Sequence, residues 1–95
     1  AIDELRARAK ATTRGETGSY SLDDICDEWA REFYFEGIRR PTLIRFGRYG
    51  GNNNYNWSWK GNAETGKNFD SHLNIFPIPV GELNANSNLQ QNPGY

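Results

Sequence analysis

The residues best suited to chemistry lie in one stretch of aromatic and amide side chains, residues 52–62. Flat aromatic rings can cover the apolar C–H patches of a sugar, while amides and charges around them match its hydroxyl groups. The candidate ligand-binding residues are Asn54, Tyr55, Trp57, Trp59 and Lys60. Alternation along an extended chain would place the three aromatic rings on one side. They would form either a sugar-binding platform or a plug that fills a core, and the plug is the commoner use of such aromatics.

The other reactive side chains do not form a recognisable catalytic or metal site. Glycoside hydrolysis needs two carboxylates that face each other across a cleft. Most of the five acidic residues at 23–32 map to the solvated face of one helix, and those at 64, 70 and 82 lie in loops without a recognisable partner. His72 is the single histidine, and a metal site normally needs several such ligands. Cys26, the single cysteine, is expected to pack on an apolar helical face as a small hydrophobe. We therefore expect no enzyme activity, no metal and no cofactor.

The composition restricts the kinds of partner. The 95 residues carry a net charge of −1, which is not the basic surface that nucleic acid requires. No apolar run is long enough to span a bilayer. Only 36% of the residues are apolar, and a domain of this size buries little surface, so these residues can form at most a small core.

Charged and amide residues are segregated along the chain. Before Gly50 lie 18 of the 23 charged residues, and after it lie all 11 asparagines. This division predicts a helical part, residues 1–47, and an irregular part, residues 48–95. Apolar spacing in the helical part predicts two helices and a short third, at 2–11, from Ser21 to about 37 or 38, and at 42–46. Ser21 and Asp24 have the spacing of a capping box, and Pro41 suits the first helical turn.

The second predicted helix has an apolar face that includes Trp29. At 100° per residue, Glu36 and Arg40 fall on the same face, four residues apart, the spacing at which opposite charges meet. A carboxylate on an apolar face needs a partner because a lone buried charge is costly. We predict a partly buried, structural ion pair between Glu36 and Arg40 that fixes the turn into the third helix.

The irregular part combines turn-forming residues with side chains that need burial. It is rich in glycine, asparagine and proline, and Pro77 and Pro79 exclude a central strand. Residues 75–79, with Phe76 as a structural anchor, are predicted to form an apolar extended strap in a groove. The predicted helices offer too little surface to bury it. We therefore expect an upstream part of the same protein to be the partner, and residues 1–95 not to be a complete independent domain.

Three ordered motifs resemble the C-terminal segment of SusD/RagB-like proteins. Residues 27–40 read DEWAREFYFEGIRR and resemble the family's ERxRELxxEGxR helix, and LIRFG follows at 43–47. FPIP at 76–79, ELN at 82–84 and NLQQNPGY at 88–95 are similar to the family's ending. The chain departs from the family pattern at Trp29, Ile38 and Thr42, where arginine, histidine and aspartate are common, so polar contacts around the helix end should differ.

The resemblance implies a larger, mainly α-helical fold with tetratricopeptide-like helix pairs, of which residues 1–95 are the C-terminal segment. Such proteins are non-enzymatic lipoproteins on the outer-membrane surface, held by an N-terminal lipidated cysteine, which Cys26 is not. They capture oligo- or polysaccharides, or other nutrients, and pass them to a TonB-dependent transporter. A mainly structural role is therefore expected for residues 1–95, with exposed loops that contact the transporter. Glycan binding by the aromatic platform is the alternative.

Overall fold

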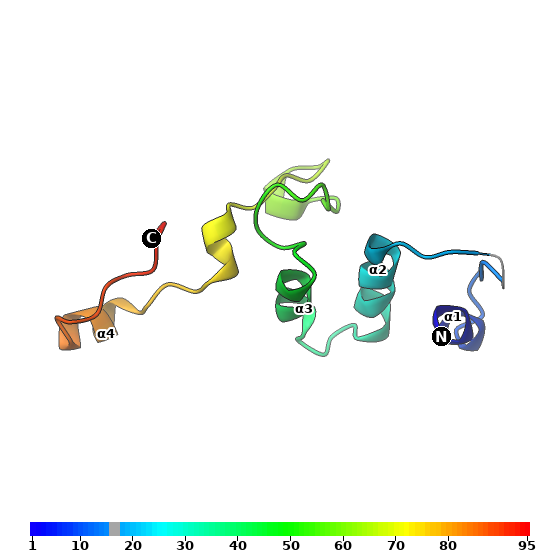
Figure 1. Cartoon of the computed structure of the whole chain (residues 1–95), viewed down its shortest axis with the longest axis horizontal. Coiled ribbons are helices and arrows are strands. Elements are labelled where there is room, and N and C mark those ends of the chain that lie inside the picture. The colour runs from blue at the N-terminus through cyan, green and yellow to red at the C-terminus, as the bar shows by residue number, and fades with distance from the viewer. Residues whose placement is uncertain (16–17) are drawn as a thin grey trace. The chain divides into compact units, whose positions relative to one another are not determined.

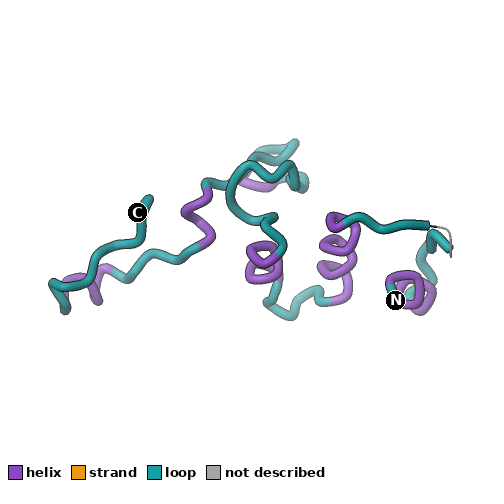
Figure 2. Tube along the Cα trace, viewed as in Figure 1, coloured by secondary structure: helices purple, strands orange, loops and turns teal. Residues whose placement is uncertain are grey.

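The computed structural model describes residues 1–15 and 18–95. In these ranges the regular structure is helical, as predicted, and the chain is mainly α (Figures 1 and 2). The α-helices are α1 (Ile2–Arg8), α2 (Leu22–Glu32), α3 (Arg39–Arg45) and α4 (Val80–Ala85), and the 3-10 helices are η1 (Lys60–Asn62) and η2 (Ser71–Asn74). Of the described residues, Gly50 and Phe69 form an isolated parallel β-bridge.

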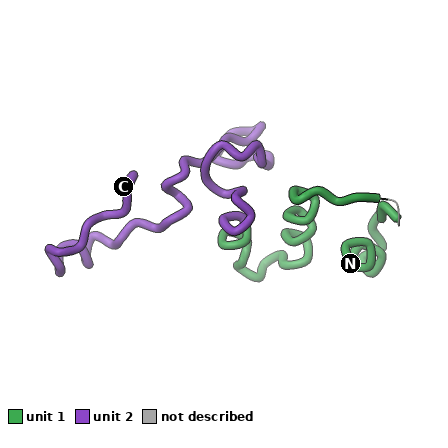
Figure 3. Tube along the Cα trace, in the orientation of Figure 1, with its two compact units in different colours: residues 1–42 green, residues 43–95 purple. Residues whose placement is uncertain are grey.

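The described chain divides into two compact units, residues 1–42 and 43–95 (Figure 3). The first unit contains α1, α2 and the start of α3. The second contains the rest of α3 and all later elements, in which loop segments predominate (Figure 2).

The start of α2 confirms the predicted capping box. The Ser21 side chain accepts a hydrogen bond from the Asp24 backbone N–H at 3.1 Å, and the Asp24 carboxylate accepts one from the Ser21 N–H at 2.9 Å. These bonds satisfy two amide donors that the first helical turn leaves without partners. Cys26 on the same helix is fully buried and is a free thiol, as predicted.

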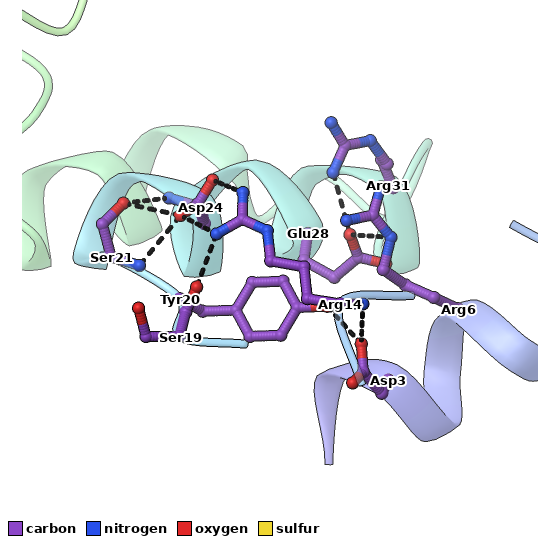
Figure 4. Close-up of polar contacts among 9 residues, drawn as sticks. All are labelled: Asp3, Arg6, Arg14, Ser19, Tyr20, Ser21, Asp24, Glu28 and Arg31. Atoms are coloured by element: carbon purple, nitrogen blue, oxygen red, sulfur yellow. Dashed lines mark hydrogen bonds and ion pairs between the residues drawn. The ribbon is translucent and has the colours of Figure 1, made fainter. Parts of the chain in front are cut away.

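A polar cluster stabilises the loop that precedes α2 (Figure 4). The Arg14 guanidinium donates two hydrogen bonds to the Asp24 carboxylate, at 2.8 and 2.9 Å, and lies 4.5 Å from the centre of the Tyr20 ring. The Tyr20 hydroxyl donates to the carboxylate of Asp3 in α1. The bond from Tyr20 and the Arg14 backbone N–H lower the pKa of Asp3, and the bonds from Arg14 and Ser21 lower the pKa of Asp24.

The helix boundaries differ from the predictions. The first helix ends at Arg8 rather than residue 11, and Lys10 adopts a left-handed φ of 56°. The second ends at Glu32. The third begins at Arg39 rather than residue 42. Its third residue is Pro41, which is tolerated because the first-turn amides have no helical acceptor.

The predicted partly buried ion pair between Glu36 and Arg40 is wrong. Glu36 is exposed, and the ion pairs among the described residues do not join it to Arg40. The helical periodicity that placed Glu36 on the apolar face stops before it, because α2 has already ended and Phe35 adopts a φ of 65°. Arg39 is the residue that reaches back to α2, where its Nη1 donates to the Cys26 carbonyl oxygen at 2.8 Å.

In the second unit, the end of the chain is hydrogen-bonded to the strap, residues 75–79. The Gln91 side chain accepts from the Ile78 N–H at 2.7 Å and donates to the Ile78 carbonyl at 3.0 Å. The Asn92 side chain donates to the Phe76 carbonyl at 2.7 Å, and the Tyr95 hydroxyl donates to the Ile75 carbonyl at 2.6 Å. We call these contacts the amide clasp. They satisfy backbone groups that would otherwise need a neighbouring strand.

Candidate functional site

The candidate ligand-binding residues lie in a closed loop, residues 49–70, which we call the aromatic loop. Its two ends are joined where the Gly51 N–H donates to the Phe69 carbonyl at 2.8 Å. The Gly50 N–H donates to the Asn74 side chain at 2.9 Å, and an added Cβ at Gly50 would lie 2.8 Å from the Asp70 carbonyl oxygen. Glycine is therefore required where the ends of the loop meet.

Lys60 fills the centre of this loop. Its side chain is 1% exposed, and its Nζ donates to the Tyr55 carbonyl oxygen at 3.1 Å. The Nζ also lies 5.0 Å from the centre of the Trp57 ring and 5.2 Å from that of Phe69, within the range of cation–π attraction. Burial lowers the pKa of Lys60. The ammonium group thus faces the loop interior and is satisfied there.

Two of the three candidate aromatic rings pack on one another within the loop, although Trp57 keeps 40% of its surface exposed. Tyr55 is 9% exposed and meets the Trp57 ring edge to face, with centroids 6.3 Å apart. Trp57 in turn meets the Phe69 ring at 6.2 Å and 79°. This arrangement is that of a plug, in which ring edges contact ring faces and stabilise one another.

Trp59 and Asn54 do not belong to that plug. Trp59 is 66% exposed and adopts a left-handed φ of 68°, and Asn54 is exposed with a φ of 56°. The predicted alternation of Tyr55, Trp57 and Trp59 on one side requires an extended backbone. The turn at residues 58–62 interrupts it, so Trp59 is separated from the other two rings by its backbone conformation.

Phe69 is central to the loop, although its sequence context indicated only a side chain that needs burial and not a member of the candidate site. Its ring lies near those of Tyr49 and Trp57 and near the Lys60 ammonium. The available signal was an isolated aromatic residue inside the polar run 67–72, because such a residue in a polar loop commonly serves as its anchor.

The residues predicted to be structural have mixed surroundings. Trp29 packs against Phe33 with ring centroids 5.0 Å apart. Both rings line a cavity of about 380 Å³ in the first unit and a second of about 370 Å³ beside α1 and α2. Phe76 is 68% exposed, although its carbonyl is held by the amide clasp.

Neither a metal site nor a membrane span is found in the part of the chain that the structure describes. The described His, Cys, Asp and Glu side chains form no group of three or more that could hold a metal ion. None of the described helices is long and apolar enough to cross a membrane. The ring of His72 packs edge to face against Tyr95, with centroids 4.9 Å apart.

Comparison with known proteins assigns this helical segment and its aromatic loop to a family. The SusD family model matches residues 1–95, and the chain belongs to that family. The chain is 48% identical over 94 residues to the starch-binding protein SusD of Bacteroides thetaiotaomicron. That alignment covers 99% of this chain and 16% of the relative, so the chain spans about a sixth of the relative's length.

Proposed function

We propose that residues 1–95 form the C-terminal segment of a non-enzymatic, glycan-binding protein of the SusD family. The observation that carries this proposal is the 48% identity, over nearly the whole chain, to a protein named for binding starch. The whole protein would act at the outer-membrane surface, held by a lipid anchor, and would pass its ligand to a TonB-dependent transporter.

Within that protein, we propose a mainly structural role for this segment. The burial of Tyr55 and Lys60 and the ring contacts of Trp57 support this role, because these groups stabilise the loop itself. Exposed apolar side chains on and beside the strap, such as Ile75, Phe76 and Val80, have the character of a surface that packs on the upstream part of a larger, tetratricopeptide-like fold.

Binding and hydrolysis can be tested together on the full-length protein. Isothermal titration with maltoheptaose, xylohexaose and cellohexaose should detect binding of at least one of them. Incubation with the same sugars should release no reducing ends above those of a protein-free control. Absence of binding to all three, or measurable turnover of any one, would contradict the proposed function.

The transporter partnership needs its own test. The full-length protein, produced together with the TonB-dependent transporter encoded nearest to it, should co-purify with that transporter from detergent-solubilised outer membranes. A lipid-anchored protein of unrelated family is the matched control. Recovery of the full-length protein alone would contradict the partnership and leave glycan binding to be judged by titration.

The structural role predicts a specific behaviour for Trp57. Replacing it with alanine in the full-length protein should lower the melting temperature, because its ring contacts both Tyr55 and Phe69. Glycan affinity measured well below that melting temperature should stay unchanged. Lost affinity at an unchanged melting temperature would instead favour the second candidate role, in which the plug residues bind the sugar.

A further inference from the structure

Trp59 occupies a backbone conformation that its side chain does not favour. Its φ of 68° is in the left-handed region, which is unusual for a bulky residue and is better suited to glycine or asparagine. The same ring is 66% exposed, so its burial within the described chain does little to offset the strain. Strained residues that folding alone does not explain are concentrated at functional sites.

The backbone around Trp59 is held rigidly. The Trp59 N–H donates to the Glu64 carbonyl at 3.3 Å, and the Trp59 carbonyl accepts from the Asn62 N–H at 3.0 Å. The next residue, Lys60, is the buried centre of the loop. An added Cβ at Gly66 would lie 2.4 Å from the Trp57 carbonyl oxygen, so the chain on the N-terminal side of Trp59 is tightly packed as well. The inward plug therefore fixes the position from which Trp59 projects.

The turn that carries Trp59 also carries polar side chains that a sugar could use. Ser58, Asn62 and Glu64 are all exposed and lie on the same hydrogen-bonded turn, residues 57–64. Together they offer a hydroxyl, an amide and a carboxylate on the same turn as one large aromatic ring. A flat ring with a few polar groups around it is the chemistry that recognises the C–H face and the hydroxyl groups of a pyranose.

We propose that Trp59 alone, rather than the three-ring platform, is a stacking residue for a pyranose ring of the bound glycan. Because its backbone is already held by hydrogen bonds, only the side-chain torsions of Trp59 need to be ordered on binding, which favours affinity. This proposal rests on the glycan-binding function proposed above. It limits the contribution of the aromatic loop to the Trp59 side chain and assigns the buried Tyr55 and Lys60, together with the less exposed Trp57, to its support.

The test exploits the unusual φ angle. In the full-length protein, Trp59→Asn should leave the melting temperature unchanged or slightly higher, since asparagine tolerates the left-handed conformation. Affinity for whichever of maltoheptaose, xylohexaose or cellohexaose the wild type binds should fall about tenfold or more, equivalent to about 1.4 kcal/mol. Trp59→Tyr keeps a flat face and should retain most of that affinity. Phe35→Asn is the matched control, because Phe35 is also aromatic, exposed and left-handed with a φ of 65°, and it should leave affinity unchanged.

Other outcomes overturn the proposal in distinguishable ways. Equal affinity of Trp59→Asn and wild type would remove Trp59 from the site while glycan binding itself stands. A lower melting temperature for both Trp59 variants would show that the ring packs on another part of the protein. Lost recovery of the TonB-dependent transporter with unchanged glycan affinity would assign the ring to a protein interface. A wild-type protein that binds none of the three sugars would remove the proposed function, and this site with it.

Discussion

The buried ammonium of Lys60 gives a quantitative test of how the aromatic loop is held together. Replacing Lys60 with methionine keeps an unbranched, mostly apolar side chain of similar length but removes the charge. It also removes the hydrogen bond to the Tyr55 carbonyl and both cation–π contacts. A hydrogen bond from a charged donor contributes about 1.5–3 kcal/mol, and an unsatisfied buried carbonyl costs about as much.

Relief of the desolvation of the ammonium group offsets part of this loss. We expect a net destabilisation of the loop of about 2 kcal/mol for Lys60→Met, after combining the charged hydrogen bond with that relief. Lys60→Ala also removes about three buried methylene groups at about 0.8 kcal/mol each, for a total of about 4 kcal/mol. The order of the two variants follows directly from the 1% exposure of this side chain.

Hydrogen–deuterium exchange on the full-length protein measures this local stability. The Gly51 and Lys67 amides donate to carbonyls across the loop. Their exchange in Lys60→Met should accelerate about 30-fold, the equivalent of about 2 kcal/mol. Amides of α2 are the internal control and should not change. Unchanged or slower exchange in Lys60→Met would refute the reasoning, because it would mean that the ammonium group contributes nothing to the loop or destabilises it.

The pH dependence gives an independent check of the same group. Burial lowers the pKa of Lys60 from its usual value of 10.5, so between the lowered pKa and 10.5 the unfolded loop binds more protons than the folded loop. Stability contributed by Lys60 therefore rises with pH through that window. The difference in loop protection between wild type and Lys60→Met should widen as the pH is raised towards 10.5. A constant difference would contradict the assigned cause.

Three further predictions concern the capping box, the polar cluster and the amide clasp. Ser21→Ala should destabilise α2 by about 1 kcal/mol, seen as faster amide exchange in residues 22–26, whereas Ser21→Thr should change little. The hydrogen bonds from Arg14 lower the pKa of Asp24. The stability that the Asp24 carboxylate contributes is therefore present above the usual aspartate pKa of 3.8 and is lost as the pH falls below 3.8. Asp24→Asn should flatten that acid-induced loss when the same exchange measurement is made over a pH series. Gln91→Ala should remove both bonds to Ile78 and weaken the clasp by about 2 kcal/mol, taking about 1 kcal/mol for each bond, whereas a polar substitution at the neighbouring exposed Gln90 should leave strap exchange unchanged.

The parts of the fold that could be predicted from sequence are those in which local chemistry decides the structure. Ser21 and Asp24 form the capping box because both partners lie within one turn of helix. Cys26 is buried because its neighbours along the helical face are apolar. The end of α2 could not be predicted in the same way, because no glycine or proline follows Glu32 until Gly37, while the backbone turns at Phe35.

The candidate site was predicted in composition but not in arrangement. Tyr55, Trp57 and Trp59 were expected to share one side, yet only the first two contact each other in the loop plug, and Trp57 is itself 40% exposed. The reason is a non-local contact: Phe69, ten residues after Trp59, supplies the surface against which Trp57 packs. A pattern of alternating residues contains no information about such a partner, nor about the burial of a lysine between two aromatic rings.

The amide clasp also determines where the chain tolerates changes in length. Gln91 binds both backbone groups of one residue, Ile78, and Asn92 binds the carbonyl of Phe76, so the pairing fixes which residues of the two segments face each other. The connection between them, residues 80–90, takes no part in that pairing. Residues added to or removed from the exposed turn at 86–89 should therefore be accommodated by the connection. A single residue inserted between Phe76 and Ile78 would move the strap backbone out of register with the Gln91 and Asn92 side chains. The end of the chain would then lose its hydrogen bonds to the strap.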